Sequence, residues 1–162
     1  MGASERFPVS LNAVNVVCFK IDWEERMLNV LLVKRSISPY KNKWSLPGGF
    51  VQGDETLEEA ARRIFVNETG ISPACLNQFR TYSDTKRDRR IINQRTEEKA
   101  RVVTTAFTAI YTSDEELRLD EESEDIRWFK IPRRYFSRYI PEDMAFDHHD
   151  ILLDASNRLR MS

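Results

Sequence analysis

The feature that most constrains the fold is a change of hydrophobic period between residues 48 and 71. This stretch reads GGFVQGDETLEEAARRIFVNETGI. Its apolar positions recur at spacings of three and four residues: Leu57, Ala60, Ala61, Ile64 and Phe65. That spacing predicts an amphipathic helix over residues 56–69. One face of the helix must therefore pack against another layer of the fold.

Residues at both ends of this helix carry boundary signals. Thr56 is a suitable N-cap, and Glu59, three residues later, completes a capping box. Gly70 predicts the C-terminal stop. The Gly48-Gly49 pair allows a tight turn or a close approach of backbone to a ligand. The stretch thus predicts a glycine turn, a loop and a helix in that order.

The rest of the chain predicts mostly strands. Runs rich in β-branched and aromatic residues predict strands over residues 13–20, 27–35, 44–46, 76–83, 102–112 and 126–131. The charged, aperiodic segment 84–100 is interpreted as a loop. Residues 145–159 predict a terminal helix, near whose start His148 is interpreted as a packing residue. We expect one mixed α/β domain spanning residues 1–162.

Composition excludes several function classes. The chain has 162 residues, 41% hydrophobic, with a formal net charge of −1. This balance does not favour nucleic-acid wrapping or membrane adhesion. No apolar run approaches the length of a membrane span, and the start has no signal core. The two cysteines, Cys18 and Cys75, form no metal motif. A reducing, cytoplasmic setting is the simplest inference.

The chemistry of residues 48–71 points to phosphate. A helix N-terminus favours anions, and glycines let backbone amides approach them. Carboxylates at relative positions zero, three and four of a helix share one face. Such a face can hold magnesium against substrate phosphates, and the metal can activate a water for attack.

The same residues resemble the box of the Nudix superfamily. Gly49, Glu55, Arg63, Glu68 and Gly70 match its glycine, first glutamate, arginine, last glutamate and final glycine. The resemblance implies a Nudix fold, a mixed β-sheet sandwiched between helices. It also implies pyrophosphate hydrolysis with Mg²⁺ or Mn²⁺, in which Glu55, Arg63 and Glu68 take part.

Two positions depart from that box. Ile64 and Asn67 stand where the family has glutamates that ligate metal. Glu68 remains a strong ligand, whereas the Asn67 amide is a weak one, so metal binding is expected to be weak or absent. Some Nudix enzymes draw a base from an outside loop, which makes Glu97 and Glu98 candidates. The alternative interpretation, solvated loop charges, is favoured for both.

Residues 80–90 and 144–160 resemble a particular branch of the superfamily. It contains ADP-ribose pyrophosphatase-like domains and Nudix-related transcriptional regulators of NAD metabolism. In those regulators a Nudix domain senses ADP-ribose, and a following winged helix-turn-helix binds DNA. The resemblance implies an ADP-ribose-like ligand, homodimers, and DNA contact only through a C-terminal domain absent from this chain. A stand-alone protein and the sensing part of a longer one both remain open.

Candidate ligand contacts follow from charge, shape and place in this pattern. They are Arg35, Gly48, Gly49, Phe50, Tyr82, Asp84, Arg87 and Arg89. Arginine's planar fork suits phosphate, and the two aromatic rings suit a base or ribose. For each charged side chain, the competing interpretation is that it is solvated and contacts no ligand. For each aromatic side chain, the competing interpretation is that it packs in the core.

Three functions are consistent with the sequence. The favoured hypothesis is a domain that binds ADP-ribose or a related NAD-derived nucleotide, with weak or absent hydrolysis. The second is an active, metal-dependent nucleoside diphosphate pyrophosphohydrolase. The third is an interaction domain without a nucleotide ligand.

Overall fold

The fold is built on one mixed β-sheet in a computed structural model that describes residues 7–132 and 139–161. In chain order the elements are β1 (Ser10–Asp22), β2 (Met27–Arg35), β3 (Trp44–Ser45), β4 (Gly48–Phe50), α1 (Leu57–Thr69), β5 (Ala74–Tyr82), β6 (Arg89–Asn93), β7 (Glu98–Tyr111), β8 (Ser123–Ile131) and α2 (His148–Met161). The main strand order is β3-β2-β1-β7-β5. In addition, β4 pairs with β1, β6 with β7 and β8 with β2.

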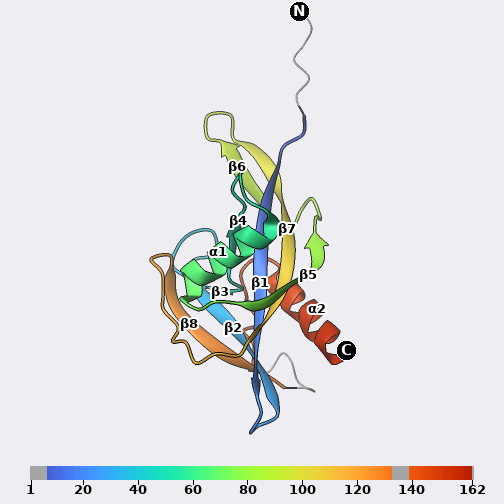
Figure 1. Cartoon of the computed structure of the whole chain (residues 1–162). Coiled ribbons are helices and arrows are strands. Elements are labelled where there is room, and N and C mark those ends of the chain that lie inside the picture. Colours follow the sequence, from blue (N-terminus) through green and yellow to red (C-terminus); the bar gives the residue numbers. More distant parts are fainter. Residues whose placement is uncertain (1–6, 133–138, 162) are drawn as a thin grey trace, which may run out of the picture.

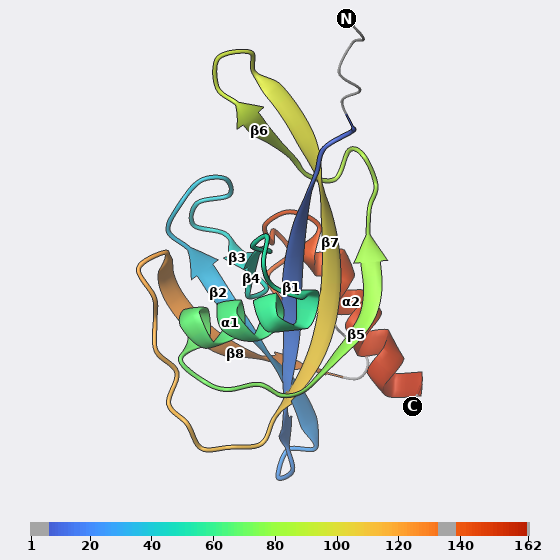
Figure 2. The same ribbon diagram turned by 45° about the horizontal axis from the view of Figure 1, so that its top comes forward.

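The two helices cover opposite faces of the sheet (Figures 1 and 2). Side chains alternate across a strand, and β1 shows this directly. Val14, Val16 and Cys18 pack in the cluster that contains the α1 residues Ala60, Ala61 and Phe65. Val17 and Phe19 pack in the cluster that contains the α2 residues Ile151 and Leu152. The expected sheet sandwiched between helices is confirmed.

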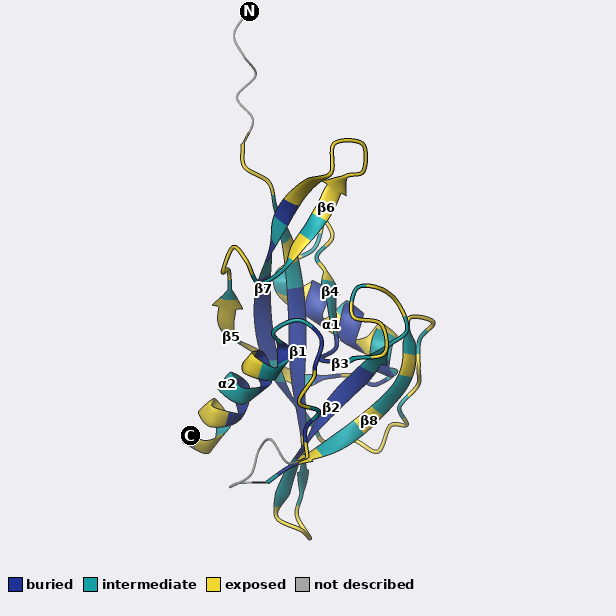
Figure 3. Ribbon diagram, turned by 180° about the vertical axis from the view of Figure 1, so that it is seen from behind, coloured by how far each residue is buried: buried dark blue, intermediate teal, exposed yellow. Residues whose placement is uncertain are grey.

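Strands β1 and β7 form the buried centre of the sheet (Figure 3). They run parallel, with Val14 opposite Thr105 and Val16 opposite Phe107. The other strand pairs are antiparallel. Because both faces of β1 are covered by helices, its central run is continuously buried and rich in β-branched residues.

The helix predicted from the period change is α1. Both hydrogen bonds of the capping box are present: Glu59 N donates to Thr56 Oγ1 at 3.1 Å, and Thr56 N donates to Glu59 Oε2 at 3.4 Å. Gly70 ends the helix in the left-handed conformation, with φ of 75°. The predicted terminal helix is α2, which begins at His148, three residues later than expected.

The prediction of a loop over residues 84–100 was wrong. Residues Arg89–Asn93 form β6, and β7 begins at Glu98, four residues before the predicted strand. The resulting hairpin extends away from the helices (Figure 2). Its residues are mostly exposed on both faces, so the alternation of polar and apolar residues that signals a strand is missing.

Neither helix in the described part of the chain is long and apolar enough to span a lipid bilayer.

Gly70 and Gly53 provide a matched test of the helix stop. A Cβ on Gly70 would lie 2.9 Å from Arg118 Cβ and 3.1 Å from Arg118 N, whereas one on Gly53 would meet nothing within 4 Å. We expect Gly70→Ala to lower the free energy of unfolding by about 1–2 kcal/mol, because alanine is strained at positive φ. Gly53→Ala should change it by less than about 0.5 kcal/mol. Equal unfolding midpoints in urea would contradict this account.

Candidate functional site

A cavity of about 290 Å³ lies beside the Gly48-Gly49 strand. Its walls come from β1, β2, β4, the β6–β7 region and the segment leading into α2. Six of its lining residues carry the argument that follows: Arg35, Phe50, Glu68, Arg90, Phe146 and His148. Cationic, acidic and aromatic groups from distant parts of the sequence therefore meet in one place.

Arg35 supplies a positive charge at the end of β2. Its Nε donates a hydrogen bond to Pro39 O at 2.7 Å, and its guanidinium carbon lies 5.2 Å from the centre of the Phe146 ring. Within the described residues it forms no ion pair with a carboxylate. Burial, and then the positive charge of Arg90, lower the pKa of Arg35 from its usual value. The cavity thus contains a cation whose charge is not neutralised by direct contact.

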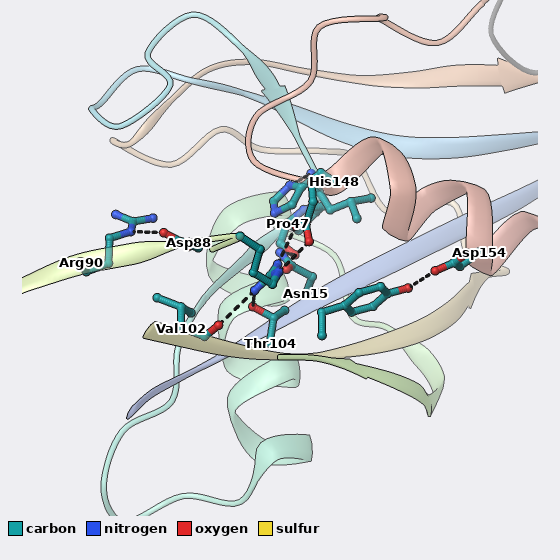
Figure 4. Close-up of polar contacts among 12 residues, drawn as sticks. Asn15, Pro47, Asp88, Arg90, Val102, Thr104, His148 and Asp154 are labelled. Atoms are coloured by element: carbon teal, nitrogen blue, oxygen red, sulfur yellow. Dashed lines mark hydrogen bonds and ion pairs between the residues drawn. The ribbon is translucent and has the colours of Figure 1, made fainter. Parts of the chain in front are cut away.

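Arg90 supplies a second positive charge and lies near two aromatic rings. Its guanidinium carbon is 5.6 Å from the centre of the Phe50 ring and 4.9 Å from that of Phe146. Its Nε donates to Asp88 Oδ1 at 2.9 Å (Figure 4). These distances lie within the range of cation–π contacts.

Phe146 sits at the centre of these aromatic contacts. Its ring centre is 4.6 Å from that of Tyr40 and 5.2 Å from that of His148. Its backbone has φ of 53°, a conformation that bulky residues rarely adopt. Strain of this kind concentrates at functional sites, where surrounding contacts hold it in place.

His148 is the first residue of α2 and is buried in the cavity wall. Leu46 N donates a hydrogen bond to its Nδ1 at 3.0 Å. Burial lowers the pKa of His148 to about 3. The ring is therefore neutral at physiological pH and has a structural role: it accepts a backbone hydrogen bond and packs against Phe146.

On α1, position 64 faces the core rather than the cavity. Ile64 is 5% exposed and belongs to the cluster beneath α1. A Cβ on Gly49 would lie 3.2 Å from Ile64 Cδ1, so helix and strand are in close contact there. Asn67 is exposed and does not line the cavity.

Glu68 is the α1 carboxylate that lines the cavity. It accepts a hydrogen bond from Gly48 N at 3.3 Å. Burial, and then the negative charge of Asp120, raise the pKa of Glu68 to about 8. Near neutral pH the group is therefore mainly protonated.

The α1 positions of the expected metal site offer few ligands. In residues 7–132 and 139–161, no group of three or more His, Cys, Asp or Glu side chains is arranged to hold one. Magnesium requires ionised or strongly polar oxygen ligands. Here Ile64 offers none and Asn67 lies outside the cavity, so Glu68 is the α1 carboxylate left in the lining.

Arg63 and Glu55 shape the loop before α1. Arg63 donates to both carboxylate oxygens of Glu55, at 2.9 and 2.5 Å, and to Phe50 O at 3.1 Å. Gln52 N also donates to Glu55. The Arg63 hydrogen bond lowers the pKa of Glu55 to about 2. Both side chains hold the loop that carries Phe50 and do not themselves line the cavity.

Arg87 is fixed by four hydrogen bonds. It pairs with both oxygens of Asp147 at 2.6 Å and donates to Thr104 Oγ1 at 2.8 Å and to Val102 O at 3.2 Å. Its side chain lines the cavity but is only 7% exposed. Arg87 therefore ties the sheet to the start of α2.

The other sequence candidates lie outside the cavity lining. Tyr82 donates its hydroxyl hydrogen to Asp154 Oδ2 at 2.6 Å. Asp84 caps a turn through Lys86 N, and Arg89 binds the carbonyl oxygens of Thr85 and Lys99. Glu97 and Glu98 are exposed in the β6–β7 hairpin.

Among the charged and aromatic residues of the cavity, sequence reasoning did not single out Arg90, Phe146 or Glu122. Arg90 directly follows the candidate Arg89. If β6 had been predicted as a strand, the two side chains would have been expected on opposite faces, because neighbours on a strand face opposite sides. Glu122 lies in the acidic segment between β7 and β8. Ser36 N donates to its carbonyl oxygen at 3.0 Å, which holds that run beside β2. No sequence signal indicates the conformation of Phe146.

Comparison with known proteins decides the family. The model of the NUDIX domain matches residues 11–144. This chain belongs to the Nudix family. It is 32% identical over 155 residues to the ADPR-responsive transcriptional repressor NtrR of Acinetobacter baylyi, covering 94% of this chain and 56% of the repressor. It is 31% identical over 130 residues to the ADP-ribose pyrophosphatase of Methanocaldococcus jannaschii, covering 80% and 67% respectively.

Solved Nudix structures share the fold. The Nudix domain of Shewanella oneidensis NrtR, solved in complex with ADP-ribose, has a TM-score of 0.75 at 29% identity, covering 94% of this chain and 90% of that one. A MutT/nudix family protein from Enterococcus faecalis has a TM-score of 0.82 at 25% identity, covering 99% and 66%. The chain spans little more than half the length of the A. baylyi repressor.

His148 predicts an acid-dependent loss of stability. The unfolded imidazole takes up a proton near pH 6.5 and the folded one only near 3. Its stabilising effect is therefore complete above about pH 6.5 and is lost as pH falls towards 3, by roughly 1 kcal/mol per pH unit. In His148→Asn the amide oxygen can still accept from Leu46 N but does not titrate. We expect wild type to lose stability relative to this variant between pH 7 and 4.5 in urea unfolding. Parallel curves would contradict the burial of a neutral ring.

Proposed function

We propose that this Nudix domain binds ADP-ribose or a related NAD-derived nucleoside diphosphate and hydrolyses it weakly or not at all. One observation carries the proposal: a single cavity combines two guanidinium groups with two phenylalanine rings next to the Gly48-Gly49 backbone. A nucleoside diphosphate presents the complementary groups, namely anionic oxygens and a planar base.

Arg35 is the proposed anchor for the diphosphate. It lines the cavity without a carboxylate partner among the described residues, so its charge is available to an anion. Arginine donates in a fork that matches phosphate oxygens. The backbone of Gly48 and Gly49 adjoins the same space. Of the sequence candidates, Arg35, Gly48, Gly49 and Phe50 remain direct ligand contacts in this proposal, with Arg87 as a support.

Weak hydrolysis follows from the α1 side chains. Ile64 is packed in the core where the family resemblance leads one to expect a carboxylate, and Asn67 is exposed outside the cavity. Binding does not need carboxylates at these positions, whereas metal-assisted attack on phosphorus needs metal ligands. The printed description of the A. baylyi relative, a repressor responsive to ADPR, supports a sensing function.

A second candidate is an active hydrolase dependent on Mg²⁺ or Mn²⁺, in line with the relative from M. jannaschii. One observation favours it: Glu122 lines the cavity. Asp120 and Glu122 both act electrostatically on Glu68. Extra carboxylates from the β7–β8 connection could thus replace those absent from α1. In this alternative Glu122, rather than Glu97 or Glu98, is the outside base.

The proposal also covers the oligomeric state and the cellular location of the protein. We infer a cytoplasmic homodimer, in which DNA would be contacted only through a C-terminal domain other than this Nudix domain. Light scattering that gives the mass of a monomer at micromolar concentration would exclude the dimer.

Calorimetry and a turnover assay test the proposed function together. ADP-ribose should bind the wild type, and Arg35→Ala should weaken binding about 10–100-fold, because a charge-assisted hydrogen bond is lost. Arg89→Ala removes the same charge outside the cavity and should have little effect. With Mg²⁺ or Mn²⁺ present, phosphate release after phosphatase treatment should stay at background.

Three outcomes would contradict this proposal. Robust metal-dependent turnover would favour the hydrolase, above all if Glu122→Gln abolished it. Equal losses of affinity in Arg35→Ala and Arg89→Ala would reject Arg35 as the anchor. Failure to bind ADP-ribose or related nucleoside diphosphates would leave an interaction domain.

Position 64 can be tested by stability. A glutamate there would place a carboxylate in an apolar contact with Gly49 and the α1 core. We expect Ile64→Glu to lower the free energy of unfolding by about 3 kcal/mol, against about 1 kcal/mol for the control Ile64→Val. If the two variants were equally stable in urea, a carboxylate could turn into the cavity and the metal site could be rebuilt.

A further inference from the structure

The Arg90 guanidinium lies within cation–π range of two cavity rings, Phe50 and Phe146, in a space suited to a flat ligand group. It is 5.6 Å from the Phe50 ring centre and 4.9 Å from the Phe146 ring centre. We name this space the Phe50–Phe146 slot. Both rings line the cavity, and Phe50 is 45% exposed. An exposed aromatic ring facing a cavity is available for stacking.

Arg90 is held much less firmly than Arg87. Arg87 uses all three nitrogens of its guanidinium and is almost fully buried. Arg90 donates through Nε alone, to Asp88, and its side chain is 25% exposed. Within the described residues its two terminal amino groups have no hydrogen-bond acceptor. Displacing the Arg90 guanidinium from the slot therefore costs two cation–π contacts and the one hydrogen bond to Asp88, and leaves the buried network around Arg87 intact.

The slot lies next to Arg35, the cavity cation without a carboxylate partner. The Phe146 ring is in contact with both Arg90 and Arg35. Arg35 has no carboxylate partner in the described part of the chain. A molecule that fills both places carries a planar π-system and a negative group a short distance away. A nucleotide has this arrangement.

We infer that the Phe50–Phe146 slot is the subsite for the nucleobase, and that Arg90 occupies it until the base displaces it. The inference rests on the proposed function and deepens it by assigning the base to one place in the cavity. Arg90 then sets specificity, because only a ligand whose base stacks better than the guanidinium can open the slot. A ligand with phosphates and no base leaves Arg90 where it is.

Two probes separate the base from the phosphate: AMP carries both, and ribose 5-phosphate carries the same phosphomonoester without a base. The measured quantity is the ratio of the AMP association constant to that of ribose 5-phosphate, obtained by calorimetry. Arg90→Ala should raise this ratio about fivefold, because the base no longer competes with the two cation–π contacts. Arg89→Ala should leave the ratio unchanged, since it removes the same charge from the same strand outside the cavity.

The rings provide the opposite test. Phe50→Leu and Phe146→Leu keep an apolar side chain and remove the aromatic face, so each should lower the ratio. Phe50 is half-exposed, so its variant keeps the test valid if Phe146→Leu does not fold. An unchanged or lower ratio in Arg90→Ala would overturn the inference even where both probes bind. Failure of both probes to bind the wild type would instead overturn the proposed function, and this subsite with it.

Discussion

The close packing of α1 on β4 is the constraint on which the site depends. Gly48 leaves no room for a side chain, because a Cβ there would lie 2.0 Å from Asn15 Nδ2 and 2.6 Å from Val14 O. Gly49 is in contact with Ile64. This contact brings the helix close enough for Glu68 to accept from Gly48 N. At this contact Ile64 is buried in the core cluster, so α1 contributes no carboxylate to the cavity from position 64.

The cavity arginines differ in how completely the protein satisfies them. Arg87 is fully paired and joins β7 to the segment before α2. Arg90 is held by one hydrogen bond to Asp88 and by two rings, and Arg35 by one carbonyl oxygen and the Phe146 ring. Arg87 and Arg90 each have a carboxylate partner, whereas Arg35 has none among the described residues. A buried charge without a partner carries a desolvation cost that an ionic ligand can offset. Arg35 therefore points to an anionic ligand.

Local signals in the sequence predicted α1 and its ends, because a capping box and a left-handed glycine act within a few residues. The core strands were also predicted, because runs of β-branched residues are a local signal within each strand. The β6–β7 hairpin was not, since its exposed residues do not alternate. Arg90, Phe146 and Glu122 meet only through the sheet topology and the turn before α2. The resemblance to Nudix proteins was enough to identify the Gly48-Gly49 segment and Arg35 as candidate phosphate contacts. The contacts of Arg90 with the Phe50 and Phe146 rings could be identified only from the folded structure.

The account claims that a nucleoside diphosphate is bound here and not cut. Phosphorus NMR of ADP-ribose mixed with the protein and Mg²⁺ tests both parts in one sample. Binding should broaden or shift the two diphosphate resonances, and no phosphomonoester resonance should grow over hours of incubation. Steady growth of the phosphomonoester signals of AMP and ribose 5-phosphate would contradict the account, as would diphosphate resonances that the protein leaves unchanged.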